Sequence, residues 1–433
     1  MAVAIAAAKW MIRRGCNPVP VPLPVALNGR RCYGSSSNSA DATAIEMVNY
    51  ARAHSRPPNV TSYPEAVRVL EQGLSIFKGD DASTANASGR LLLEMATLKA
   101  DRGDIRDAAE RLKQASDMTY SSIEIRVAAL EALTGLHLRM HQDVIASDYG
   151  DRCLHLLENA EIKMDSEKLQ ALEMRAKAIK GLVELACGRV DSAESYFAGW
   201  NVKDIKNRNG LGAVALAYAE FIHVTGNFPL AKQLYELALE LSGTENTVVA
   251  SVPSAAAMVL EEVQLGAACA LGQLATHSGH FDEAEQRLTQ VLKKAEEYYG
   301  GHNQKVGIVL LCIAEMFGHK GRSEGASYFL IQEGLYRRSL EMLKAPSLDQ
   351  EGISKEIDQK DVIALARGGY AQLLSPQRNR AGEAEKMKEW AVVVWENSRT
   401  TLEKVLEKTE TSIDEERKMD ATVVTDMRLG RVF

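Results

Sequence analysis

Residues 266–317 read GAACALGQLATHSGHFDEAEQRLTQVLKKAEEYYGGHNQKVGIVLLCIAEMF. The apolar residues Ala267, Leu271 and Leu274 recur every three or four positions, which is the spacing of one buried helix face. Gly279 ends this run. A second run with the same spacing follows, and it carries acids in its first turn, where the helix dipole favours them. The stretch therefore predicts two helices joined by a glycine turn, followed by the first helix of another pair.

A turn glycine followed five positions later by an alanine recurs along the chain. Copies of this pattern lie at Gly103, Gly188, Gly226 and Gly279, and a weaker copy lies at Gly321. The alanines of successive copies are separated by 85, 38, 53 and 42 residues, and the longest interval has room for one degenerate pair. The chain is therefore expected to consist of helical pairs joined by loops of variable length.

These pairs resemble the tetratricopeptide repeat, and in their length they are similar to the repeats of kinesin light chains. The resemblance covers about residues 63–398 and is strongest within residues 170–320. It implies an all-α fold, in which tetratricopeptide-like helical hairpins form an α-solenoid superhelix. It also implies a groove, lined by the first helices, that binds a protein or peptide partner. The template positions that face this groove hold Glu220, His223, Gln273, His277, Glu315 and His319.

Known groove chemistries of the family are missing. Members that grip the acidic ends of chaperones use basic and asparagine residues, but Leu216, Cys269 and Leu311 occupy one of these positions. The paired asparagines of kinesin light chains are replaced by Leu311 and Cys312. The resemblance therefore predicts the fold and a binding role without identifying the partner.

Composition narrows the class of partner. The formal net charge is −7, and the first forty residues carry five basic residues and no acid, so the remainder carries −12. Because nucleic-acid affinity depends on lysine and arginine, a nucleic-acid partner is not expected, whereas a basic peptide or protein is. No run of eighteen apolar residues predicts a transmembrane segment. The sequence leaves the oligomeric state open.

No catalytic motif stands out. A phosphate-binding loop, a nucleophile elbow and a dinucleotide fingerprint are all missing from the sequence. His137 and His141 have the i, i+4 spacing of metal ligands but lack the adjacent glutamate of a zinc protease. The six cysteines show no close paired spacing, so neither a zinc site nor a disulfide framework is expected. The protein is expected to be neither an enzyme nor a carrier of a cofactor or metal.

Three regions are expected. Residues 1–40 are basic, contain serines and are free of acids, which is typical of an organellar presequence, and Arg31 before Tyr33 resembles a mitochondrial processing site. We expect a mitochondrial location, with plastid and cytoplasm as alternatives. Residues 41–398 form the repeat array. Residues 399–433 are expected to close it with the end of a capping helix and to fray after Asp420.

The resulting functional prediction is a non-catalytic scaffold or assembly factor in an organelle. One alternative is a stable accessory subunit of a large mitochondrial complex. Another is a cytosolic transport adaptor similar to kinesin light chain.

Overall fold

A computed structural model describes residues 38–57, 62–79, 81–158, 165–208, 210–243, 252–325, 327–348, 357–407 and 422–433. In these residues the protein is all-α, with eighteen α-helices, two short 3-10 helices and one pair of two-residue strands. The α-helices are α2 (Asn38–Ser55), α3 (Tyr63–Ile76), α4 (Ala82–Asp101), α5 (Ile105–Asp117), α6 (Ile123–Arg139), α7 (Asp143–Glu158), α8 (Ser166–Ala186), α9 (Val190–Phe197), α10 (Val202–Lys206), α11 (Gly212–Val224), α12 (Phe228–Gly243), α13 (Leu260–His277), α14 (Phe281–Tyr299), α15 (Gln304–Glu324), α16 (Phe329–Met342), α17 (Lys360–Leu374), α18 (Ala381–Val394) and α19 (Leu402–Leu406).

Most helices pack against their neighbour in sequence and so form pairs. Within the described residues the pairs are α2–α3, α4–α5, α6–α7, α8–α9, α11–α12, α13–α14, α15–α16 and α17–α18. Helix α3 packs against α2 and so belongs to a pair. Four turns between paired helices contain the predicted glycines, Gly103, Gly188, Gly226 and Gly279, with φ between 76° and 86°. A side chain is strained at such φ values, which explains the glycines.

The degenerate pair expected between the copies at Gly103 and Gly188 is α6–α7, and its turn lacks this glycine. His141 takes its place between α6 and α7, with φ 56° and the same backbone pattern, in which its N–H donates to Leu138 O at 3.0 Å. The prediction of a turn at Gly321 is wrong, because Gly321 lies inside α15. The helix continues to Glu324 and ends at Gly325, which adopts the left-handed conformation. One extra helical turn explains why the sequence after Gly321 did not fit the template.

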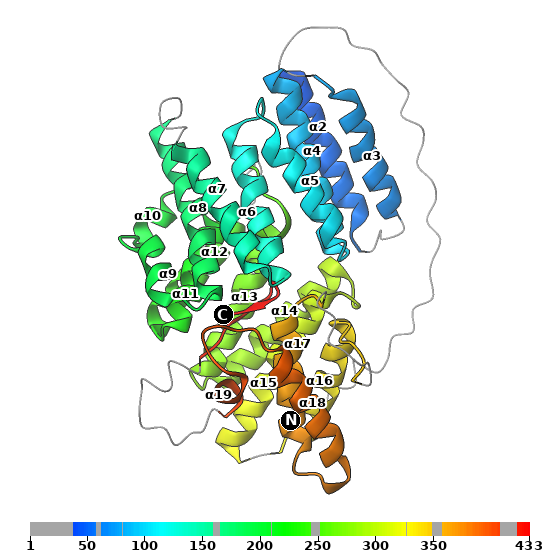
Figure 1. The fold of residues 1–433 in the computed structure, drawn as a ribbon, viewed down its shortest axis with the longest axis vertical. Helices are drawn as coiled ribbons and strands as arrows, with labels where there is room; N and C mark the ends of the chain where they lie inside the picture. Colours follow the sequence, from blue (N-terminus) through cyan, green and yellow to red (C-terminus); the bar gives the residue numbers. More distant parts are fainter. Residues whose placement is uncertain are drawn as a thin grey trace.

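The first helices of the pairs form a row in the order α2, α4, α6, α8, α11, α13, α15 and α17, each in contact with the next. The row bends back toward its own start. Arg139 at the end of α6 forms an ion pair with Asp358, just before α17, with 2.7 Å between Nη2 and Oδ2. Asn303, the N-cap of α15, donates to the carbonyl of Asp101 on α4 at 2.9 Å. The row therefore curves and encloses an inner face (Figure 1).

Two segments lie against this inner face. Residues 252–259, which we call the inner loop, contact α4, α6 and α13 through the 3-10 helix Ala256–Met258. Residues 422–433, which we call the inner hairpin, form strands β1 (Thr425–Asp426) and β2 (Arg431–Val432), paired antiparallel. In Figure 1 the inner hairpin is the red segment between α13 and α17. All twelve of its residues are buried.

The expectation for the end of the chain is therefore wrong for residues 422–433, which pack in the interior instead of fraying. The expected end of a capping helix is also not seen as such: α18 ends at Val394, and in the described residues after it only the short α19 is helical. At that point the indole N–H of Trp395 donates to Thr400 O at 2.8 Å, which stabilises a loop. Of the predicted presequence, residues 1–37 lie outside the described residues, and residues 38–40 belong to α2. No described helix is long and apolar enough to cross a membrane.

Candidate functional site: the inner face

Two of the six residues predicted to face a groove hold the inner hairpin. The side-chain amide of Gln273 on α13 makes two hydrogen bonds to the main chain of Thr425, donating to its O and accepting from its N, both at 2.9 Å. Glu220 on α11 accepts from Nη2 of Arg428 at 2.8 Å, and both side chains are 1% exposed. A segment of the same chain therefore occupies the inner face at these two residues.

The hairpin geometry itself places Arg428 against Glu220. Asp426 accepts hydrogen bonds from the backbone N–H groups of Arg428 and Leu429 and from the Arg428 side chain, at 2.7, 3.3 and 2.9 Å. Gly430, with φ 60°, completes the turn. The aliphatic part of Arg428 lies on Gly266 of α13, where a β-carbon would come within 2.8 Å of Cγ. Only glycine leaves room for the arginine at that position.

The three predicted histidines form a second row, on α11, α13 and α15. His223 Nε2 lies 2.9 Å from His277 Nδ1, and the rings of His277 and His319 are 6.2 Å apart between centroids. His223 also contacts the hydroxyl of Tyr235 at 3.1 Å and is fully buried. Glu315 is half-buried on α15. His223 lies on α11 and His277 on α13, the two helices that hold the inner hairpin. Glu315 and His319 lie on α15, the next first helix in the row.

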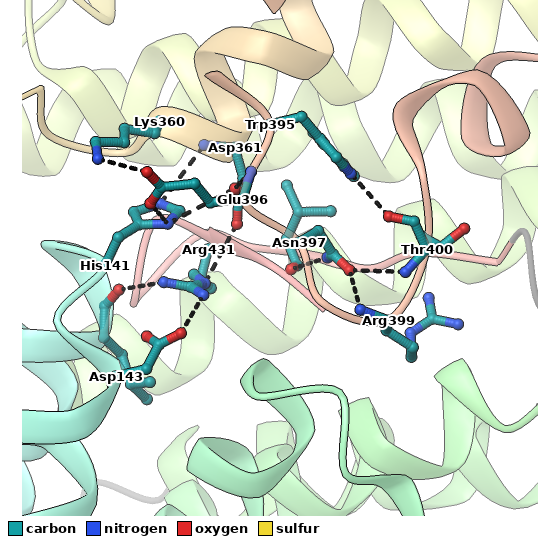
Figure 2. A network of polar contacts seen from close by, with 12 residues as sticks. His141, Asp143, Lys360, Asp361, Trp395, Glu396, Asn397, Arg399, Thr400 and Arg431 are labelled. Atoms are coloured by element: carbon teal, nitrogen blue, oxygen red, sulfur yellow. Dashed lines mark hydrogen bonds and ion pairs between the residues drawn. The ribbon is translucent and has the colours of Figure 1, made fainter. Parts of the chain in front are cut away.

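Arg431 anchors the other end of the hairpin, as Figure 2 shows. It donates to the carbonyl of Leu138 at 3.0 Å and to Asp143 at 2.8 Å, and its Nε lies 3.2 Å from Asp361 Oδ2. His141 lies beside this group, with Nδ1 3.6 Å from both Asp361 and Glu396. The unusual backbone of His141 thus belongs to the α6–α7 turn that receives the hairpin.

Further contacts come from the loop after α18, whose Asn397 and Arg399 are labelled in Figure 2. Asn397 donates to Val432 O at 2.7 Å, and Arg399 donates to Phe433 O at 3.4 Å and to Thr422 O. Side chains of α7, α11, α13, α17 and this loop, together with a carbonyl of α6, therefore converge on twelve residues.

Burial shifts the pKa values of the acids and the histidine in this region. Burial raises the pKa of Glu220 well above its usual value, against the opposing effect of Arg428. It also raises the pKa of Asp361 to about 7, although Arg431 favours the charged carboxylate. Burial, with help from Arg431 and Lys360, lowers the pKa of His141 to about 2. The main cause of all three shifts is the removal of these side chains from water, which disfavours the charged form.

The inner loop occupies the first half of the inner face in a different way. Its Ala255 and Ala256 are buried in the apolar cluster of α4 to α8. Thr97 Oγ1 accepts from the N–H of Ala256 at 2.9 Å, and Arg175 donates to Pro253 O at 3.0 Å. A cavity of about 260 Å³ remains beside the loop, lined by both apolar and charged side chains. Arg175 and its partner Glu131 are among them.

Sequence reasoning missed Arg428, Arg431, Asp143 and Asp361. Their one signal lies in residues 422–433, TVVTDMRLGRVF, where charged residues interrupt an otherwise apolar run with a glycine suited to a turn. Glu220 lies 208 residues before its partner Arg428, and Asp143 lies 288 residues before its partner Arg431. No local sequence pattern connects the acids with these arginines.

Within the described ranges, no group of three or more His, Cys, Asp or Glu side chains is arranged to hold a metal ion. His137 contacts Gln142, and His141 lies in the turn, so the two do not share a helix face. Cys269 and Cys312 are free thiols with 3.9 Å between their sulfurs, close to Gln273.

The chain matches no protein-family model, and no curated protein is significantly similar to it.

Proposed function

We propose that this protein is a non-catalytic scaffold or assembly factor: an α-solenoid superhelix of tetratricopeptide-like hairpins that binds a protein or peptide partner on its inner face. The observation that carries the proposal is the pair of hydrogen bonds between Gln273 and the main chain of Thr425. An inner face that pairs with the backbone of an extended segment makes the contacts that peptide recognition requires. The row of first helices and the positive-φ turn glycines support the repeat interpretation.

The chemistry of the inner face favours a partner that carries positive charge. Glu220, Asp143 and Asp361 all contact arginines of the inner hairpin. Glu220 and Asp361 are buried, and a buried carboxylate without a cation nearby is costly. This agrees with the expectation of a basic peptide or protein, and with the expectation that nucleic acid is not the partner.

The composition of residues 1–40 supports a mitochondrial location. The test is affinity purification from isolated mitochondria, followed by N-terminal sequencing of the recovered chain. The tag belongs between residues 349 and 356, because a tag after Phe433 would adjoin the buried hairpin. We expect a chain that starts near Gly34 and a reproducible co-purifying protein. An intact N-terminus in the cytosol would instead favour the transport adaptor and refute import.

Size separation of the same extract distinguishes the remaining alternative. An assembly factor is expected both free and in a complex, because its association is temporary. A stable accessory subunit is expected at high mass alone. Recovery of the protein without any partner, under conditions that preserve known mitochondrial complexes, would contradict the scaffold function.

A further inference from the structure

The inner hairpin combines apolar contacts with specific polar ones. Its apolar residues join the two largest core clusters: Val424, Leu429 and Phe433 enter one, and Val423, Met427 and Val432 enter the other. At three further points, polar side chains of the helices bind it. Gln273 binds its main chain, Glu220 binds Arg428, and Asp143 together with Asp361 binds Arg431. This combination of apolar anchors and charged pairs is typical of a protein interface.

The charged contacts contribute mainly specificity. Taking arginine and carboxylate groups out of water costs about as much free energy as their attraction returns, so a buried pair adds little stability compared with apolar residues of the same size. An isolated buried charge is much less favourable than the pair. The site therefore discriminates strongly against an occupant that lacks the two arginines.

We propose that the inner hairpin is an intramolecular ligand, and that its site on α6, α7, α11, α13 and α17 binds, in its place, an arginine-bearing segment of a partner protein. The segment carries two arginines three residues apart, as Arg428 and Arg431 are, on a tight turn flanked by apolar residues. This inference rests on the proposed scaffold function and names the chemistry of its partner. Gln273 binds main-chain atoms, so it requires no particular side chain at that point.

Covalent linkage gives the inner hairpin an advantage over any partner. A segment on the same chain competes at an effective concentration on the order of millimolar. A separate segment of equal intrinsic affinity therefore binds the intact chain roughly a hundredfold or more weakly than a chain whose hairpin can leave. A partner segment therefore binds the intact chain only if its affinity for the site is high enough to displace the hairpin.

The test keeps the whole chain. A specific protease site is placed within residues 408–421, which connect α19 to the inner hairpin, and the folded protein is cut there. A fluorescent peptide of residues 422–433 is then added, and fluorescence anisotropy follows its exchange into the site. We expect saturable binding to the cut chain and at least roughly hundredfold weaker binding to the uncut chain.

Variant peptides test the chemistry. The Arg428→Gln peptide is expected to bind at least about thirtyfold more weakly, because Glu220 and Asp426 lose their buried cation. The Thr425→Val peptide is the matched control. The hydroxyl of Thr425 has no hydrogen-bond partner among the described residues, so this change of nearly equal volume is expected to leave affinity unchanged or improve it. Changing Glu220→Gln in the cut chain is expected to reduce the difference between the original peptide and the Arg428→Gln peptide, which a double-mutant cycle measures.

Three outcomes overturn the inference. The cut hairpin never exchanges while the protein stays folded, or its release unfolds the helices as judged by far-UV circular dichroism, or the Arg428→Gln peptide binds as well as the original. In the first two cases the hairpin is part of the permanent core. Failure of the scaffold function has a separate signature, because the mitochondrial purification recovers no partner whatever the peptide does.

Discussion

The inner loop and the inner hairpin solve the same problem with different chemistry. Both cover the inner face of the curved row of helices, and they meet where Arg428 Nη1 lies 4.0 Å from the sulfur of Met258. The inner loop is built from Ala255, Ala256, Ala257 and Met258, which pack on apolar side chains. The inner hairpin brings two arginines into contact with three carboxylates of the helices.

This difference separates stabilisation from recognition. Apolar burial is non-directional and tolerates many sequences of similar volume, so the inner loop works as a core element. Ion pairs removed from water require matching partners, so the inner hairpin is specified by Glu220, Asp143 and Asp361. An apolar segment such as the inner loop stabilises the array. A segment held by ion pairs, such as the inner hairpin, suits a site that selects its occupant.

The largest effect is expected from Arg428→Ala. The change leaves Glu220 and Asp426 without their buried cation, and we expect a loss of about 3–5 kcal/mol in the free energy of unfolding. Urea denaturation measures it. The exposed Arg68 on α3 provides the control, since Arg68→Ala is expected to stay within about 0.5 kcal/mol of the original protein.

A double variant sharpens this result. Arg428→Met combined with Glu220→Gln is expected to lose less than the sum of the two single changes, because the two charges neutralise each other. Additive losses would show that the pair is not coupled. The conclusion that ion pairs specify the inner hairpin, in contrast to the apolar inner loop, would then be wrong.

The next effect is a pair of opposite pH dependences around Arg431. Folding raises the pKa of Asp361 from 3.8 to about 7, so between these values the folded chain holds a proton that the unfolded chain releases. Asp361 alone therefore makes stability fall as pH rises. Folding lowers the pKa of His141 from 6.5 to about 2, so His141 alone makes stability rise with pH up to 6.5.

In the original protein the two slopes oppose each other between about pH 4 and 6.5, and single variants expose them. His141→Asn, which tolerates the left-handed backbone, is expected to leave stability falling by roughly 1.4 kcal/mol per pH unit. Asp361→Asn is expected to leave it rising by a similar amount. Urea midpoints measured relative to the original protein at several pH values test this. Slopes of the same sign in both variants would contradict the assignment.

A smaller effect is expected in the inner loop. Thr97→Val removes the acceptor of the buried Ala256 N–H and is expected to cost about 1–3 kcal/mol. Thr134→Val is the matched control, because that buried hydroxyl donates to a carbonyl of its own helix, Leu130 O. Thermal or urea unfolding compares the two. Equal losses would mean that the contact to the loop adds nothing beyond the change of residue.

The smallest effect is local and uses the cysteines as reporters. Cys269 and Cys312 lie near Gln273, beneath the inner hairpin, whereas Cys153 is buried in the cluster next to the inner loop. Arg428→Ala is expected to speed the reaction of a thiol reagent with Cys269 and Cys312 while Cys153 stays slow, because local opening exposes only the first two. Mass spectrometry of labelled peptides reads each site. Equal acceleration at all three would indicate global opening instead.

The paired helices were predictable because their signals are local. Apolar residues at helical spacing and the glycines at 103, 188, 226 and 279 define hairpins, and the structure shows all-α pairs there with positive φ at each glycine. The prediction of a turn at Gly321 was wrong because α15 has one additional helical turn and ends at Gly325. His141 was hidden because its backbone resembles that of a glycine while its side chain serves a distant contact.

The sequence by itself thus determined the all-α class and the helical pairs around Gly103, Gly188, Gly226 and Gly279. What covers the inner face was decided only in the tertiary structure. Residues 422–433 form neither a long helix nor an extended sheet by themselves, and their arginines are stable in the interior only where Glu220, Asp143 and Asp361 converge. Because folding brings these acids together from three distant helices, the place of the inner hairpin depends on tertiary contacts and not on local sequence.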